Sequence, residues 1–89
     1  DVGMSLNNLA QLYQAQGDNA KAIPLYERAL MIKEDILGKD HPRIGIILNN
    51  YADCLEALGK TKEAAAARAR VKKIQDRIDR KSGKQMPPV

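Results

Sequence analysis

The chain has one cysteine, Cys54, and one histidine, His41, the two residue types that can act together as nucleophile and general base. His41 lies in a Gly-Lys-Asp-His-Pro segment typical of a connector, and Cys54 falls beside the apolar stripe of an expected helix, where a buried inert thiol is the ordinary interpretation. One cysteine with one histidine cannot form a Cys/His metal site. No glycine-rich phosphate loop or paired-carboxylate site is visible in the sequence. We therefore expect no enzyme activity, catalytic residue, metal, cofactor or small-molecule substrate.

Two pairs of adjacent asparagines, Asn7-Asn8 and Asn49-Asn50, offer a different chemistry. An asparagine amide both donates and accepts hydrogen bonds, so it suits the backbone of an extended peptide whatever the peptide's sequence. Two other interpretations stay open at this point. The amides are simply solvated, or one asparagine of each pair braces a neighbouring helix.

A basic segment between Arg68 and Lys84 holds eight cations against two acids, Asp76 and Asp79. Such a patch could contact nucleic acid or an acidic membrane. No aromatic residue accompanies it and the two acids interrupt it, so a solvated helix face is the better interpretation. No apolar run approaches the ~20 residues that a membrane-spanning helix needs. The lone cysteine favours a reducing, cytoplasmic location.

An internal repeat of 42 residues determines which elements carry these side chains. When the sequence is shifted by 42, 12 of the 47 comparable positions are identical in one register without a gap. Self-similarity of this kind indicates stacked supersecondary units. The matches include Gly3 with Gly45, Leu6-Asn7-Asn8 with Leu48-Asn49-Asn50, Ala10 with Ala52, and Ala22 with Ala64.

Each unit is expected to form two helices, because its apolar residues recur with a period near 3.6. The four helices should cover about 2–16, 19–37, 42–58 and 61–80, which makes the chain all-α. Gly17 is a plausible left-handed stop, Asp18 a cap for the second helix, His41 or Asp40 a cap for the third, and Thr61 a cap for the fourth.

The pattern Leu6-x-x-Leu9-Ala10-x-x-Tyr13 followed by Ala22-x-x-x-Tyr26 resembles the tetratricopeptide repeat. The second copy keeps Leu48, Tyr51, Ala52, Leu55 and Ala64 but has Arg68 in place of an aromatic residue. The 42-residue period, together with the string from Pro24 to Leu30 and the connector from Leu37 to Pro42, resembles the kinesin light chain variety. The resemblance implies tandem antiparallel helix-turn-helix units of a right-handed α-solenoid.

This resemblance divides the chain into a repeat over 1–41, a second repeat over 42–80 and a flexible tail over 81–89. The second repeat should be a C-terminal cap, because Ile23, Leu25, Tyr26 and Leu30 become Ala65, Ala67, Arg68 and Lys72. We expect the fragment to come from the end of an array that has lost a preceding repeat.

In tetratricopeptide arrays the first helix of each repeat lines a concave groove. The resemblance therefore implies that a bound peptide contacts Met4, Asn7, Asn8, Gln11, Ile46, Asn49, Asn50, Asp53 and Glu56. Arg43 is the only cation on either first helix, whereas Asp53 and Glu56 are acidic, so a neutral to basic partner is expected. The expected function is a protein interaction scaffold. The alternative is a homo-oligomer formed through the uncovered apolar residues Val2, Leu9 and Leu12.

Overall fold

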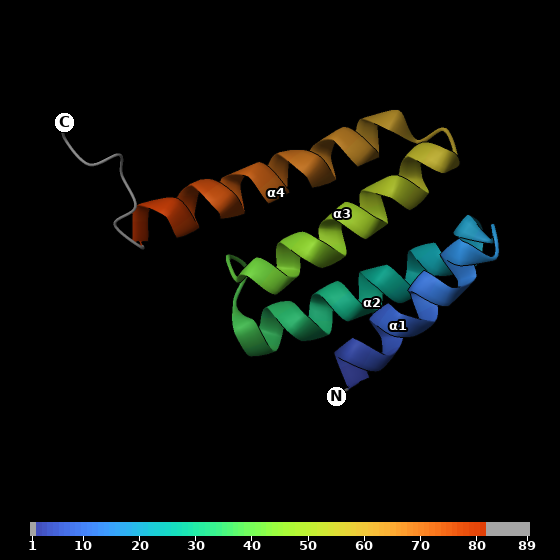
Figure 1. Cartoon of the computed structure of the whole chain (residues 1–89), viewed down its shortest axis with the longest axis horizontal. Coiled ribbons are helices and arrows are strands. Elements are labelled where there is room, and N and C mark those ends of the chain that lie inside the picture. Colours follow the sequence, from blue (N-terminus) through green and yellow to red (C-terminus); the bar gives the residue numbers. More distant parts are fainter. Residues whose placement is uncertain (1, 82–89) are drawn as a thin grey trace.

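The computed structural model describes residues 2–81 and contains four α-helices (Figure 1). They are α1 (Val2–Ala15), α2 (Asn19–Leu37), α3 (Pro42–Ala57) and α4 (Thr61–Lys81). Helices α1 and α2 pack as one antiparallel pair and α3 and α4 as another, which confirms the predicted all-α class. Lys81 ends α4, and the rest of the predicted flexible tail lies outside the described residues.

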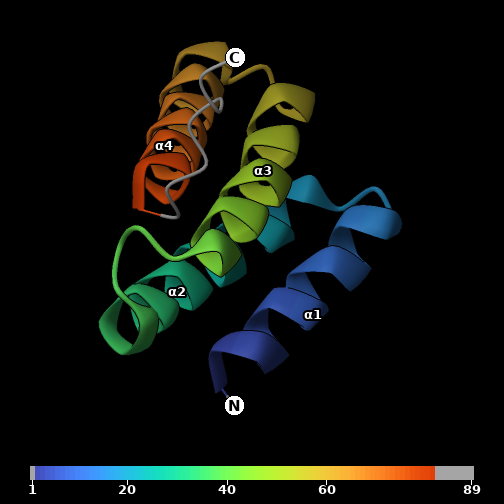
Figure 2. The ribbon, with the colours of Figure 1, turned by 60° about the vertical axis from the view of Figure 1, so that its left-hand side comes forward.

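The two hairpins are joined through α2 and α3. In Figures 1 and 2, α1 and α4 lie on opposite sides of α3. Helix α2 packs along α3, whereas α1 meets α3 only slightly and does not contact α4. Each helix therefore packs chiefly against its neighbours in chain order, as helices in stacked repeats do.

Both intra-hairpin turns depend on a glycine with positive φ. Gly17 has φ +83° and Gly59 has φ +79°, values that favour glycine over residues with a Cβ. The residue after each glycine closes the turn, with Asp18 N donating to Tyr13 O at 2.9 Å and Lys60 N to Leu55 O at 2.8 Å. The first turn follows the sequence prediction for Gly17.

The helix starts agree with the predicted caps in two cases and differ in one. Asp18 Oδ1 accepts from Lys21 N at 3.3 Å at the start of α2. His41 Nδ1 accepts from Arg43 N at 3.1 Å at the start of α3. The prediction that Thr61 caps α4 is wrong, because Thr61 is itself the first helical residue.

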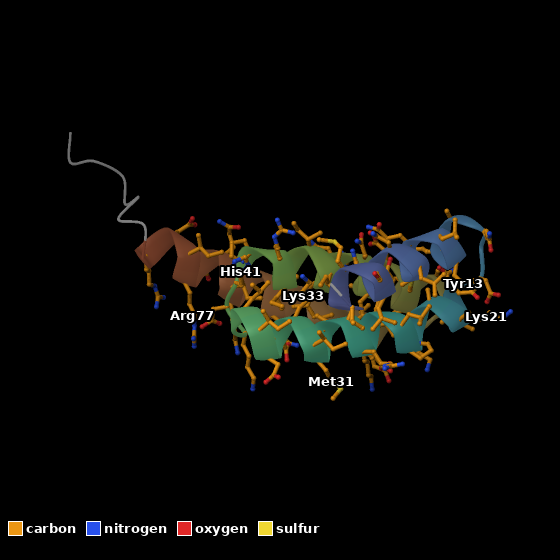
Figure 3. All side chains as sticks on the ribbon, turned by 90° about the horizontal axis from the view of Figure 1, so that it is seen from below. Tyr13, Lys21, Met31, Lys33, His41 and Arg77 are labelled. Carbon is orange, nitrogen blue, oxygen red and sulfur yellow. The ribbon has the colours of Figure 1, made fainter. Side chains whose placement is uncertain are left out.

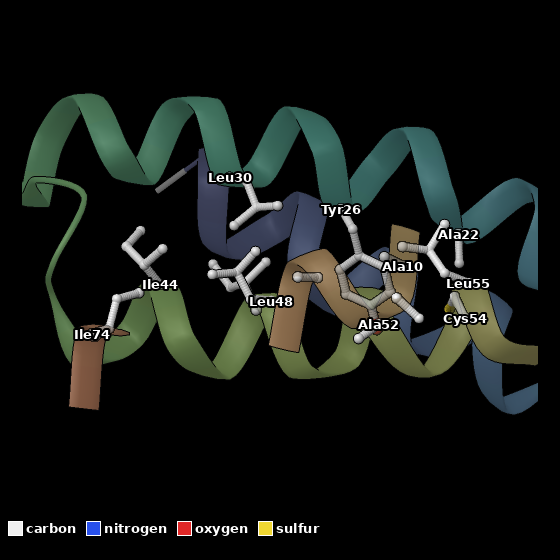
Figure 4. Close-up of a cluster of buried hydrophobic side chains, with 13 residues drawn as sticks. Ala10, Ala22, Tyr26, Leu30, Ile44, Leu48, Ala52, Cys54, Leu55 and Ile74 are labelled. Carbon is white, nitrogen blue, oxygen red and sulfur yellow. The ribbon is translucent and has the colours of Figure 1, made fainter. Parts of the chain in front are cut away.

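Four repeat-related alanines, one on each helix, are fully buried in the core, and Ala29 on α2 is equally buried. Large side chains pack between the helices (Figure 4). Small residues let helix backbones approach closely, and larger ones then fill the remaining space. The main filler is Tyr26, which is fully buried and projects from α2 towards α3. The core comprises Ala10, Ala22, Tyr26, Leu30, Ile44, Ile47, Leu48, Ala52, Cys54, Leu55, Ala64, Ala67 and Ile74.

Two tyrosine hydroxyls tie neighbouring helices together. Tyr26 donates to Gln14 Oε1 at 2.6 Å, which joins α2 to α1, and Tyr51 donates to Glu27 Oε2 at 2.8 Å, which joins α3 to α2. Burial raises the pKa of both phenols from 10.0 to about 12. The negative charge of Asp53 adds to the effect at Tyr26, and the hydrogen bond to Glu27 adds to it at Tyr51.

The repeat-related glycines Gly3 and Gly45 have unequal surroundings. A Cβ on Gly3 would lie 3.1 Å from Lys33 Cγ and 3.2 Å from Ile32 Cγ2, so α1 approaches α2 closely at this point. A Cβ on Gly45 would meet only Val71 Cγ1, at 3.9 Å. The first hairpin is therefore packed more tightly here than the second.

We expect Gly45→Ala to stabilise the protein by about 0.5–1 kcal/mol, because alanine loses less conformational entropy in a helix. Gly3→Ala should give no such gain, because Lys33 and Ile32 must shift to admit the methyl group. Urea unfolding followed by circular dichroism measures both variants. An equal gain in the two would contradict the packing difference.

The raised tyrosine pKa values predict a loss of stability at alkaline pH. Because each folded-state pKa exceeds its ordinary value of 10.0, the neutral phenols stabilise the fold below pH 10, and this contribution disappears as the pH rises towards about 12. Phenolate absorbance and helical circular dichroism, recorded together against pH, should show the Tyr26 and Tyr51 transitions accompanying helix loss. A Tyr26→Phe variant should lack one of them. Ionisation of every tyrosine near pH 10 with the helices intact would contradict this.

Candidate functional site

The predicted binding residues of α1 differ in their exposure to solvent. Asn8 and Gln11 are exposed and free to contact a partner, and Met4 is half-buried. Asn7 is only 8% exposed, so it belongs to the interior of the first repeat rather than to open surface. The asparagine pair therefore divides into one exposed and one buried amide.

The matching residues of α3 are more open. Ile46 and Asn49 are exposed, and Asn50 is half-buried. Asn49 is the repeat mate of Asn7, yet it is not covered. The difference follows from stacking order, because the start of α3 lies beside Asn7 whereas no later repeat lies beside Asn49 within residues 2–81.

A cavity of about 120 Å³ brings together three of the predicted residues, Met4, Asn7 and Ile46. It lies where α1, α2 and the start of α3 meet. Arg43 and Ile47 from α3 and Lys33 from α2 complete its lining. The remaining predicted residues do not line it.

Lys33 is a site residue that the sequence analysis missed. It is 5% exposed and projects from α2 between the helices (Figure 3). Its position continues the buried stripe of α2 through Tyr26 and Leu30 at spacings of four and three, so the helical period places it on the inner face. That period is the sequence signal for Lys33, whereas the groove prediction includes only residues of the first helix of each repeat.

The two carboxylates at the acidic end of the expected groove, Asp53 and Glu56, are hydrogen-bonded to a residue of α4. Arg68 Nη2 from α4 donates to Asp53 Oδ1 at 2.9 Å and to Glu56 Oε1 at 2.7 Å. The hydrogen bond to Asp53, followed by that to Glu56, raises the pKa of Arg68 above its ordinary value. The predicted groove polarity therefore needs a correction, because one guanidinium offsets part of the charge of the two carboxylates.

Two further arginines of α4 are also paired with earlier elements. Arg70 donates to Glu34 of α2, and Arg77 Nη1 donates to Asp40 Oδ2 of the connector at 2.7 Å. With Arg68, these pairs engage three cations of the basic segment inside the chain. Fewer of its cations are thus available to bind phosphate groups.

The two candidate catalytic residues, His41 and Cys54, have different structural roles. His41 uses Nδ1 to cap α3, and Cys54 is a fully buried free thiol. Burial, with a smaller contribution from Asp53, raises the pKa of Cys54, which keeps the thiol protonated and unreactive. Among residues 2–81, no group of three or more His, Cys, Asp or Glu side chains could hold a metal ion. None of the helices described is both long and apolar enough to cross a membrane.

Comparisons with known proteins agree with this arrangement. The family described as Tetratricopeptide repeat matches residues 1–75. The chain is also similar to Tetratricopeptide repeat protein 19, mitochondrial, from Homo sapiens, with 33% identity over 63 residues. That match covers 71% of this chain but 17% of the relative, so the chain spans only a small part of the relative's length.

Proposed function

The chain belongs to the tetratricopeptide repeat family, and from this premise we propose that it is an interaction scaffold that holds a peptide segment of a partner protein across α1 and α3. Repeats of this family generally support protein–protein interaction. The observation that carries the proposal is the accessibility of amide side chains on both α1 and α3. Asn8, Gln11 and Asn49 are exposed and Asn50 is half-exposed, and we call these four residues the strip.

The charge along this strip supports a neutral to basic partner. Asp53 and Glu56 carry two negative charges and Arg68 one positive charge, which leaves this end of the strip net negative. Arg43 lies at the other end, at the start of α3. A partner segment with lysine or arginine near Asp53 and Glu56 should therefore be favoured, although less than the two acids alone would imply.

The outer face of α4 supports a capping role for the second repeat. Ala65, Ala66, Ala69, Lys72 and Lys73 are all exposed, so α4 offers small and charged residues where a further repeat would need apolar ones. We keep repeat boundaries at 1–41 and 42–80 and assign the chain to the kinesin light chain-like variety on its 42-residue period. The cytoplasm stays our predicted location, while the relative's own name places that protein in mitochondria.

The scaffold proposal predicts that extended peptides perturb the strip and little else. We expect titration with a panel of neutral and lysine-containing peptides to shift the amide signals of Asn8, Gln11, Asn50 and Asp53 in nuclear magnetic resonance spectra. Acidic peptides of equal length serve as the control and should bind more weakly. No shift at these residues with any neutral or basic peptide would remove the proposal.

A second candidate function is self-association through the outer face of α1. Val2, Leu9 and Leu12 are all exposed there, with Leu12 at 55%. An apolar face of this kind gains free energy when a second copy covers it. The surface is distinct from the buried seam between α1 and α2.

If this second candidate holds, light scattering should show dimers at high protein concentration, and Leu12→Asp should return the protein to monomer. Met31→Asp is the matched control, because Met31 is 71% exposed and projects from α2 away from the bundle (Figure 3). It should leave the dimer intact. A monomeric mass for the unmodified protein at every concentration would exclude this function.

A further inference from the structure

The cavity between α1, α2 and α3 contains an acceptor without a donor. Asn7 is 8% exposed, and its Oδ1 has no hydrogen-bond partner. Buried polar atoms in folded proteins are nearly always paired, so such an exception calls for an explanation.

The same cavity is lined by an exposed cationic donor. Arg43 lines it, and within residues 2–81 its guanidinium makes no hydrogen bond or ion pair; only its backbone N–H is engaged, by His41. Lys33 also lines the cavity, but it already has an interaction within the chain. Asn7 Oδ1 therefore lacks a donor, and the exposed Arg43 guanidinium is available to donate to an acceptor that a ligand brings.

The size and the remaining walls of the cavity restrict the ligand further. Met4, Ile46 and Ile47 make the rest of the lining apolar. A volume of about 120 Å³ is well below the ~300–1,000 Å³ of sites for whole drug-sized molecules. One side chain with an apolar stem and a compact polar end fits these limits.

We propose that this cavity receives the side-chain carboxamide of a glutamine or asparagine in the bound segment. Its NH₂ group donates to Asn7 Oδ1, its carbonyl oxygen accepts from the Arg43 guanidinium, and its methylene stem packs against Met4 and Ile46. The inference rests on the proposed scaffold function and names one residue type that the partner must present.

Other side chains satisfy only part of this requirement. A carboxylate can accept from Arg43, but it sets acceptor against acceptor at Asn7 Oδ1. An ammonium can donate to Asn7, but it brings a like charge next to Arg43 and Lys33. A purely apolar side chain leaves Asn7 Oδ1 without a donor. Sites built for a specific hydrogen bond reject analogues that lack it.

Four capped amino acids test the assignment directly. N-acetyl N-methylamides of glutamine, glutamate, methionine and lysine are titrated into labelled protein while the Asn7 side-chain amide and the Ile46 and Ile47 methyl signals are followed. The glutamine probe should give saturable shifts at millimolar concentration. The other three should bind at least about fivefold more weakly.

Matched variants separate a site from a surface effect. Asn7→Leu should remove the preference for the glutamine probe, whereas Asn49→Leu, at the exposed repeat mate, should keep it. Because Asn7→Leu alters a buried position, Arg43→Met supplies a second test at an exposed residue and should also reduce the preference. Unchanged preference in both Asn7→Leu and Arg43→Met would overturn the assignment.

Three probe results would also overturn it: glutamate binding as tightly as glutamine, methionine binding as tightly as glutamine, or no saturable shift with glutamine. These failures differ from failure of the scaffold function. Peptides that shift Asn8, Gln11 and Asn50 while the glutamine probe shows no preference would overturn the carboxamide assignment alone. Saturable glutamine binding without any peptide response on the strip would overturn the scaffold function instead.

Discussion

Close approach of helices at four alanines is the constraint on which the rest of the structure depends. Ala10, Ala22, Ala52 and Ala64 are completely buried, and each helix contributes one of them. A larger side chain at any of these positions would separate two backbones and leave Tyr26 with space that it could not fill. The cavity, the amide strip and the tyrosine hydrogen bonds all require the spacing that these methyl groups set.

Most of the fold could be predicted because its determinants are local or periodic. Helical periodicity, the glycine at position 17, and caps at Asp18 and His41 act within a few residues, and the structure has each in place. Thr61 shows the limit of such reasoning. Its residue type favours a capping position, but the helix includes it, so composition identified the turn and missed the boundary by one residue.

The candidate site was less predictable because its features arise between elements. Arg68 belongs to α4, and only the folded hairpin brings it to the carboxylates of Asp53 and Glu56. Repeat symmetry placed Asn7 and Asn49 together among the expected groove residues, but only Asn7 has the start of a following repeat beside it within residues 2–81. Sequence identity between repeats therefore cannot distinguish a buried amide from an exposed one, whereas the order of stacking can.

Helices α1 and α3 are hardly in contact, so the binding of a partner segment across them is linked to the folding of α1. Helix α1 packs chiefly on α2, so it can fray from its end while α2 and α3 stay paired. A segment lying across α1 and α3 would bridge elements that the chain itself hardly connects. Binding of such a segment would therefore stabilise α1 against local unfolding, by an amount set by the free energy of binding.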